Sequence, residues 1–137
     1  MLRLSKLADY AVVVMHHMGQ RLPGTLSNAA QLSEELNLPR PTISKLLKLL
    51  VKSRLVLSER GVGGGYQLAR LPENITVADI VFAIEGSPAM TECSDVNKVC
   101  EHQDNCAVRR NWQALNRTVV KMLQGVSLVD IGQEHAE

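Results

Sequence analysis

The sequence predicts a mainly α-helical chain with one small β-hairpin, arranged as a winged helix-turn-helix followed by a long C-terminal dimerisation helix. Three observations lead to this prediction. Only 3% of the residues are aromatic while 45% are apolar, and an aliphatic core of this kind favours helices over sheets. Two short helical patterns joined by a turn precede two strand-like runs that flank a glycine-rich turn. Near the C-terminus, apolar residues recur every three or four positions, which indicates a helix that pairs with another helix.

The first three helices are predicted from apolar runs and from the residues at their ends. Residues 5–18 are nearly all apolar and are closed by Gly19, which suits a buried first helix. We expect Ser27 to cap a second helix that ends at Asn37. Pro39 and Pro41 open a third helix, because a proline in the first turn lacks only an N–H that has no helical partner.

The third helix has an apolar and a basic face. Lys45, Lys48 and Lys52 lie about 180° from the apolar side at 100° per residue. A solvated lysine face would give the same pattern in a single helix, but a basic helix after a tight turn is also typical of DNA recognition. The inward stripe consists of Ile43, Leu46, Leu47 and Leu50.

The residues that follow decide between these alternatives. Residues 55–60 and 66–70 read as two strands, and residues 61–65 read as the turn between them. A helix-turn-helix followed by a β-hairpin is a winged helix. Arg60 and the glycines after it would allow the tip of the wing to approach a sugar–phosphate backbone closely.

The C-terminal half contains a fourth helix, an aperiodic cysteine-bearing stretch and a long helix. Thr76 and Asp79 resemble a capping box, and Gly86 ends the helix that they begin. Residues 89–106 show no helical period. The spacing of apolar residues from 108 onward predicts a heptad seam, after which Ser127 caps a short last turn. The seam consists of Val108, Trp112, Leu115, Val119, Met122 and Val126.

The net charge of +1 hides an uneven distribution of charge. Residues 1–80 carry ten Lys and Arg against six Asp and Glu, whereas residues 81–137 carry five against eight. This asymmetry fits a front that faces nucleic acid and an acidic rear. The N-terminus has no signal-peptide pattern and no stretch is long enough to span a bilayer, so we expect a cytoplasmic protein without a membrane partner.

Three cysteines, Cys93, Cys100 and Cys106, lie in a stretch rich in acidic residues. An odd number of cysteines in a cytosolic chain argues against a disulfide framework. Three thiolates suit an iron–sulfur cluster or a zinc ion. The spacing Cys-x6-Cys-x5-Cys is that of neither a zinc ribbon nor a ferredoxin, so spacing alone favours metal binding over free thiols only modestly.

Over almost its whole length the chain resembles the winged-helix iron–sulfur transcription regulators of the IscR and NsrR type. Cys93 and Cys106 lie in sequences that look like the branch regulating the SUF system of iron–sulfur cluster assembly. The marks of the resemblance are Leu4-Ser5-Lys6 with Asp9-Tyr10-Ala11, the wing Arg60-Gly61-Val62-Gly63-Gly64-Gly65-Tyr66-Gln67-Leu68-Ala69-Arg70, and the segments Thr91-Glu92-Cys93-Ser94 and Cys106-Ala107-Val108-Arg109-Arg110-Asn111-Trp112.

The resemblance implies a homodimer that binds a palindromic double-stranded DNA operator and carries a 2Fe–2S or 4Fe–4S cluster. It places Ser5 and Lys6 on phosphate, the third helix in the major groove, and the wing on the minor groove or backbone. The DNA-binding residues are then Ser5, Lys6, Arg40, Pro41, Thr42, Ser44, Lys45, Lys48, Arg60, Gly61, Gly63 and Gly64.

The resemblance assigns three cluster ligands to the cysteines and leaves the fourth open. Where the cluster-assembly regulator has a histidine, this chain has Arg109, a cation unsuited to ligation. Asp9 matches the aspartate that the nitric-oxide sensor supplies from the other subunit. His102, within the cysteine-bearing stretch, is its rival.

The sequence therefore predicts a transcription regulator and not an enzyme. We divide the chain into three regions. Residues 1–86 form the winged helix-turn-helix, residues 87–107 the cluster-binding loop, and residues 108–137 the dimerisation helix and tail. We expect a repressor or dual regulator of iron–sulfur cluster assembly genes whose DNA affinity follows its cluster. The alternatives are a thiol- or zinc-based sensor and, from another class, a cluster-containing redox enzyme or electron carrier. An enzyme is disfavoured because no nucleophile–base pair or cofactor loop is visible.

Overall fold

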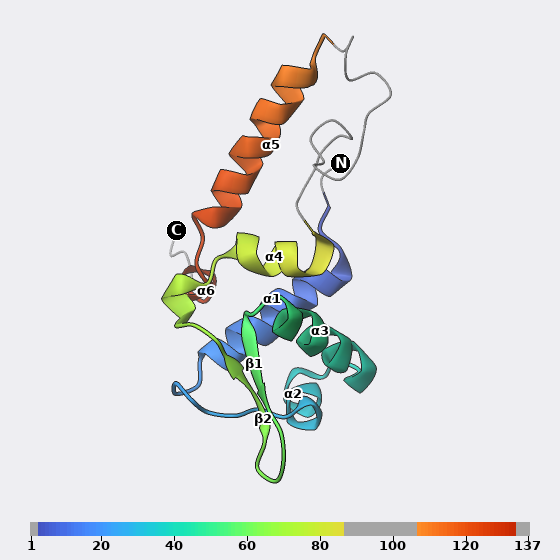
Figure 1. Cartoon of the computed structure of the whole chain (residues 1–137), viewed down its shortest axis with the longest axis vertical. Helices are drawn as coiled ribbons and strands as arrows, with labels where there is room; N and C mark the ends of the chain where they lie inside the picture. The colour runs from blue at the N-terminus through green and yellow to red at the C-terminus, as the bar shows by residue number, and fades with distance from the viewer. Residues whose placement is uncertain (1–2, 87–106, 134–137) are drawn as a thin grey trace.

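A computed structural model of the chain describes residues 3–86 and 107–133 (Figure 1). It confirms the prediction of a mainly helical chain with one antiparallel hairpin. The elements follow in the order α1 (Lys6–Gly19), α2 (Ala29–Leu36), α3 (Arg40–Lys52), β1 (Val56–Glu59), β2 (Gly65–Leu68), the 3-10 turn η1 (Pro72–Asn74), α4 (Val77–Glu85), α5 (Arg109–Gln124) and α6 (Leu128–Ile131).

The first two helices begin at side-chain caps, one of which differs from the prediction. The Ser5 hydroxyl accepts the Ala8 N–H at 3.1 Å and begins α1. The cap of α2 is Asn28, whose side-chain oxygen accepts the Gln31 N–H at 2.7 Å, so the prediction of Ser27 was wrong. Ser27 is buried instead, and its backbone exchanges hydrogen bonds of 2.8 and 2.9 Å with Tyr66 of β2.

Capping boxes also begin α4 and α6. At α4 the Thr76 hydroxyl accepts the Asp79 N–H at 3.1 Å, and the Asp79 carboxylate accepts the Thr76 N–H at 3.0 Å. Ser127 and Asp130 repeat this arrangement at α6. Each box satisfies N–H groups that lack helical partners. The sequence predicted the box at Thr76 and the Ser127 cap, and the structure adds Asp130 to the latter.

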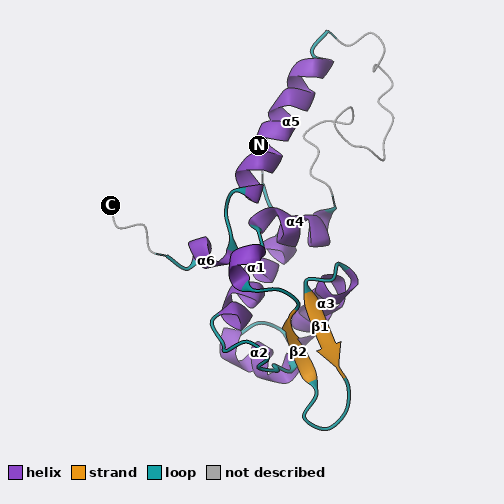
Figure 2. Ribbon diagram, turned by 60° about the vertical axis from the view of Figure 1, so that its left-hand side comes forward, coloured by secondary structure: helices purple, strands orange, loops and turns teal. Residues whose placement is uncertain are grey.

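The core lies where α1, α3 and α4 meet, with α2 and the hairpin at its edge (Figures 1 and 2). All four residues of the predicted α3 stripe are fully buried. Met15 of α1, Leu32 of α2 and Ile80 of α4 join the same cluster. A buried Leu, Ile or Met side chain stabilises the fold by roughly 1.5–3 kcal/mol relative to an exposed one.

The helix α5 extends away from this core, while the chain after it returns to the core (Figure 1). None of its 16 residues is buried in the chain as described. After α5, the Val126 carbonyl accepts the Val77 N–H at 2.9 Å and Leu128 donates to the Ile75 carbonyl at 2.8 Å. Leu128 is only 2% exposed, so α6 is anchored in the winged-helix core. None of the described helices is both long and apolar enough to cross a membrane.

Candidate nucleic-acid interface

The outward face of α3 is basic and open to solvent. Lys45, Lys48 and Lys52 are all exposed, opposite the buried stripe. Arg40, Pro41 and Ser44 are also exposed near the start of the helix, and Thr42 is half-buried. A buried apolar side holds this helix rigidly, so the face can be presented to a ligand without rearrangement of the core.

The turn between α2 and α3 fixes the angle at which α3 leaves the body. Asn37 adopts the left-handed conformation with φ of 54°, which Asn tolerates better than most residues. The Ser33 hydroxyl donates to the Leu38 carbonyl at 2.6 Å, and the Leu38 N–H donates back to the Ser33 carbonyl at 3.2 Å. These contacts satisfy the backbone of a tight helix-turn-helix.

An ionic cluster ties α1 and the loop after it to α2. His17 Nε2 lies 2.6 Å from a carboxylate oxygen of Glu35, and the Arg21 guanidinium donates to the same oxygen. The hydrogen bond with His17, followed by that with Arg21, lowers the pKa of Glu35 below its ordinary value of 4.5. Glu35 therefore stays ionised and helps to hold the helix-turn-helix against α1.

The wing is a short hairpin whose turn needs glycine. The register pairs Val56 with Leu68 and Glu59 with Gly65. Gly63 has φ of 78°, and the Gly64 N–H donates to the Gly61 carbonyl at 3.0 Å to close the turn. A Cβ at Gly64 would lie 2.4 Å from the Glu59 carbonyl oxygen, so no other residue fits without a backbone shift. Arg60 and Gly61 are exposed beside the tip.

The start of α1 is already engaged in hydrogen bonds. Besides capping Ala8, Ser5 donates its N–H to the Glu85 carboxylate at 2.7 Å, which joins α1 to the end of α4. Lys6 is exposed. A phosphate that accepted the Ser5 N–H would have to displace Glu85, whereas Lys6 is accessible without rearrangement.

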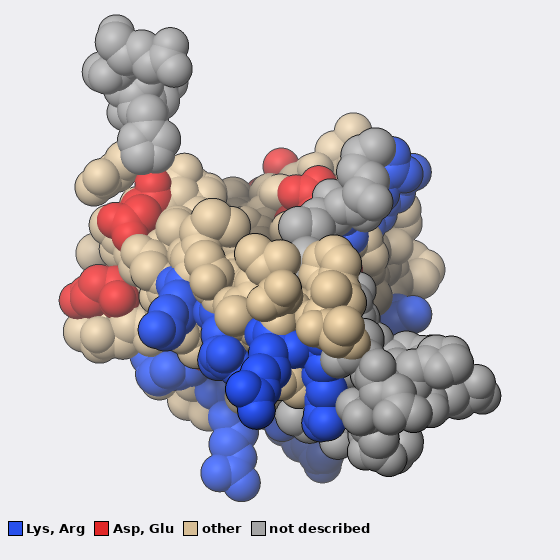
Figure 3. All heavy atoms as spheres, turned by 90° about the horizontal axis from the view of Figure 1, so that it is seen from above, with Lys and Arg blue, Asp and Glu red and all other residues tan. Residues whose placement is uncertain are grey.

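Basic side chains gather on one part of the surface when the molecule is seen from above. Most Lys and Arg side chains that face the viewer lie in the lower half of Figure 3, and the Asp and Glu side chains lie to the left and above. On this face the separation concentrates positive potential in one part of the surface, a distribution that favours contact with a polyanion.

The predicted metal ligands are only partly within the described residues. Cys93, Cys100, Cys106 and His102 lie outside them. Asp9 lies in the first turn of α1, exposed, and no hydrogen bond or ion pair of its carboxylate is found within the described residues. Within residues 3–86 and 107–133, no group of three or more His, Cys, Asp or Glu side chains could hold a metal ion. Three thiolates and a carboxylate are donors that suit an iron–sulfur cluster or zinc.

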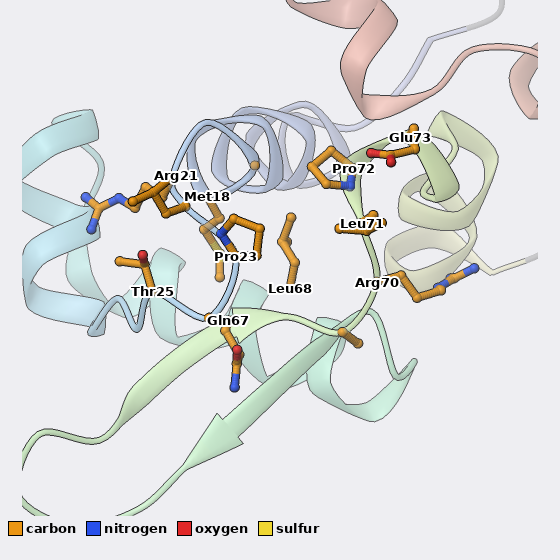
Figure 4. Close-up of a pocket in the computed structure, with 14 residues that line it drawn as sticks. Met18, Arg21, Pro23, Thr25, Gln67, Leu68, Arg70, Leu71, Pro72 and Glu73 are labelled. Carbon is orange, nitrogen blue, oxygen red and sulfur yellow. The ribbon is translucent and has the colours of Figure 1, made fainter.

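A pocket lies between the loop after α1 and the chain after β2 (Figure 4). Met18, Pro23, Leu68 and Pro72 are among the apolar residues that line it. The guanidinium groups of Arg21 and Arg70 point away from its centre in opposite directions. Because these cations do not converge, the pocket shows no arrangement that would fix a charged ligand.

Two exposed residues near the interface were not singled out from the sequence. Arg54 has φ of 62° and lies between α3 and β1, where it adds a further cation close to the basic face. Val62 lies at the tip of the wing and is fully exposed. Val62 stands inside the glycine turn that the sequence predicts, whereas no sequence pattern indicated the left-handed conformation of Arg54.

Comparison with known proteins identifies the family. The sequence model of the Rrf2 family, an iron-dependent transcriptional regulator, matches residues 4–134. Protein rrf2 of Nitratidesulfovibrio vulgaris is 30% identical over 119 residues, which is 87% of this chain and 76% of that protein.

Two solved structures share the fold at 26% identity. The structure of IscR from T. potens superposes with a TM-score of 0.73 and covers 99% of this chain and 92% of that one. The structure of CymR, the global cysteine regulator of B. subtilis, gives a TM-score of 0.71 and covers 96% of both chains. These relatives are regulators of transcription rather than enzymes, as the sequence predicts for this chain.

Proposed function

The chain belongs to the Rrf2 family of DNA-binding transcription regulators, and from this premise we propose that it is a homodimeric regulator whose DNA affinity is set by an iron–sulfur cluster. The observation that carries the proposal is that a chain with an exposed basic recognition helix also has three cysteines, which precede the long helix α5 in the sequence. Iron–sulfur cluster assembly genes are the proposed targets, with repression, or dual regulation, as the proposed mode.

The DNA contacts are proposed from the position of α3 and the wing. Exposed Arg40, Ser44 and Lys45 near the start of α3 would enter the major groove, with Pro41 and Thr42 beside them, and Lys48 would reach phosphate. Arg60, Gly61, Gly63 and Gly64 would place the wing on the minor groove or backbone. Lys6 would add a phosphate contact at the start of α1, and Ser5 only after release of Glu85.

The proposal of a homodimer is supported by the apolar seam of α5. Trp112, Leu115 and Met122 are 37%, 49% and 63% exposed in the single chain. Val119 completes the seam, while Val108 and Val126 lie just outside the helical residues. A row of large apolar side chains on a protruding helix favours pairing with a second copy, because pairing removes this surface from water.

The cluster is proposed to be held by Cys93, Cys100 and Cys106, with Asp9 as the fourth ligand and His102 as the rival. The exposed Asp9 carboxylate, which has no partner within the described residues, supports this assignment. An iron–sulfur cluster supplies a group whose charge and occupancy change with iron supply or oxidants. Such a change in the cluster would shift the equilibrium between two conformations of the dimer that differ in DNA affinity.

The experiment that tests the cluster is an absorption spectrum with iron and sulfide analysis of anaerobically purified full-length protein. We expect visible absorption with matching iron and sulfide, and a changed spectrum in Asp9→Ala. Glu34→Ala, which removes an exposed carboxylate from α2, is the matched control and should leave the spectrum unchanged. Colourless protein without sulfide would exclude the cluster, and an unchanged Asp9→Ala spectrum would return the fourth position to His102.

A thiol- or zinc-based sensor is the second candidate function. Its support is the likeness to CymR, which is named as a global cysteine regulator, together with the same three cysteines. Stoichiometric zinc would favour this candidate, as would DNA binding that responds to a thiol oxidant in iron-free protein.

A further inference from the structure

The tip of the wing presents a single side chain. Residues 61, 63, 64 and 65 are glycines, so Val62 is the only residue of the turn that extends beyond the backbone. Its side chain is fully exposed. The wing projects from the body of the molecule, with this turn at its far end (Figures 1 and 2). Within the turn, Val62 is therefore the one side chain that an approaching surface would contact.

The turn holds Val62 in a defined position. The hydrogen bond from the Gly64 N–H to the Gly61 carbonyl encloses Val62 and Gly63, and the positive φ of Gly63 is the geometry that a type II turn needs at this place. The branched Val62 side chain has few rotamers. A small rigid side chain on a closed turn is suited to reading the shape of a narrow surface.

We propose that Val62 is a specificity-determining residue that enters the minor groove of the operator and disfavours G·C pairs beneath the wing. This inference rests on the proposed function, since it assumes that α3 occupies the adjacent major groove. The valine side chain offers no hydrogen bond to phosphate, so contact with the DNA backbone alone would not use this side chain. The minor groove is about 6 Å wide, and a glycine tip with one short side chain is thin enough to enter it.

The base edges at the floor of the minor groove explain the preference for A·T over G·C pairs. A·T pairs present only acceptors there, whereas a G·C pair adds the N2 amino group of guanine. An isopropyl group placed over that amino group removes its water and supplies no acceptor, and a buried donor without a partner is costly. We therefore expect roughly five- to tenfold weaker binding when G·C replaces A·T at the step under Val62.

The test uses duplex oligonucleotides and the full-length protein. A preferred operator is first selected from a random duplex pool, and the pair under the wing is then changed to G·C or to inosine·C. Inosine lacks the N2 amino group but keeps the major-groove edge of guanine. Wild-type protein should bind the G·C operator weakly and the inosine·C operator within about twofold of A·T.

Two variants identify Val62 as the source of the preference. Val62→Ala, which keeps the backbone of the turn, should bind A·T and G·C operators with nearly equal affinity. Val129→Ala, which shortens a valine of α6 that is 41% exposed, should keep the wild-type preference. Weak binding of inosine·C, or an unchanged preference in Val62→Ala, would overturn the inference. If no operator is selected at all, it is the proposed function that fails.

Discussion

Replacement of Lys48 by alanine tests whether the exposed face of α3 carries DNA phosphate contacts. Lys48 is exposed on the face opposite the buried stripe, and no ion pair of its ammonium group is found among the described residues. Alanine forms helices at least as well as lysine, so the helix and its core should be preserved. The variant therefore changes charge at the interface without a foreseeable change in fold.

The magnitude follows from symmetry and counterion release. A dimer on a palindromic operator places two copies of Lys48 on DNA, and each phosphate contact adds about 0.9 to the slope of log K against log salt. Loss of both contacts should make that slope shallower by about 1.8. The contribution of counterion release to log K vanishes at about 1 M salt. At 0.1 M salt the shallower slope therefore corresponds to roughly sixty-fold weaker binding by the variant, or about 2.4 kcal/mol.

The assay is a fluorescence-anisotropy titration of an operator duplex at several salt concentrations between 50 and 200 mM. Lys121→Ala is the matched control, because Lys121 is exposed on α5 and its loss changes the net charge equally. The control should keep the wild-type slope. An unchanged slope in Lys48→Ala, or an equal change in both variants, would refute the placement of α3 on DNA.

Three further predictions concern assembly and stability. Leu115→Glu on the α5 seam should give a monomer by light scattering, whereas Arg117→Glu, off the seam, should stay dimeric. Leu47→Ala, in the fully buried α3 stripe, should lower the free energy of unfolding in urea by about 2–5 kcal/mol. Glu35→Gln should be less stable than wild type near neutral pH. Because the folded pKa of Glu35 is lowered, this difference should shrink as pH falls from 4.5 through the folded pKa; a difference that does not depend on pH would contradict the role of its charge.

The helices could be predicted closely because their signals are local. The proline start and buried stripe of α3, the end of α2 at Asn37, the capping box of α4 and the Ser127 cap of α6 each depend on residues within a few positions of one another. Ser27 was misassigned for the opposite reason. Its backbone pairs with Tyr66, a contact between residues far apart in the sequence that no local pattern reveals, and Asn28 is left as the cap.

The seam and the wing show the same division between local and distant causes. Heptad spacing predicted the exposed row on α5, but α5 ends at Gln124 with Gly125 as its C-cap, and the Val126 carbonyl instead accepts the Val77 N–H from a distant part of the chain. The glycines of the wing were predicted to allow close approach to DNA. The structure gives at least Gly64 a separate reason, since the Glu59 carbonyl leaves no room for a side chain.

The two helices that flank the cysteine-bearing stretch are anchored in different ways, and this difference bears on regulation. Before the stretch, α4 is fixed by buried Ile80 and Val81. After it, α5 has no buried residue among its described positions, and the residues that follow its C-terminal end, Val126 and Leu128, are hydrogen-bonded to the body. A rearrangement of the cysteine-bearing stretch would therefore move α5 more readily than α4. Since α5 carries the proposed dimer seam, its reorientation would change the distance between the two copies of α3 while the core stayed intact. Half-sites one helical turn apart require this distance to be about 34–36 Å. We therefore expect the cluster to alter operator affinity by changing the geometry of the dimer and not the conformation of α3 itself.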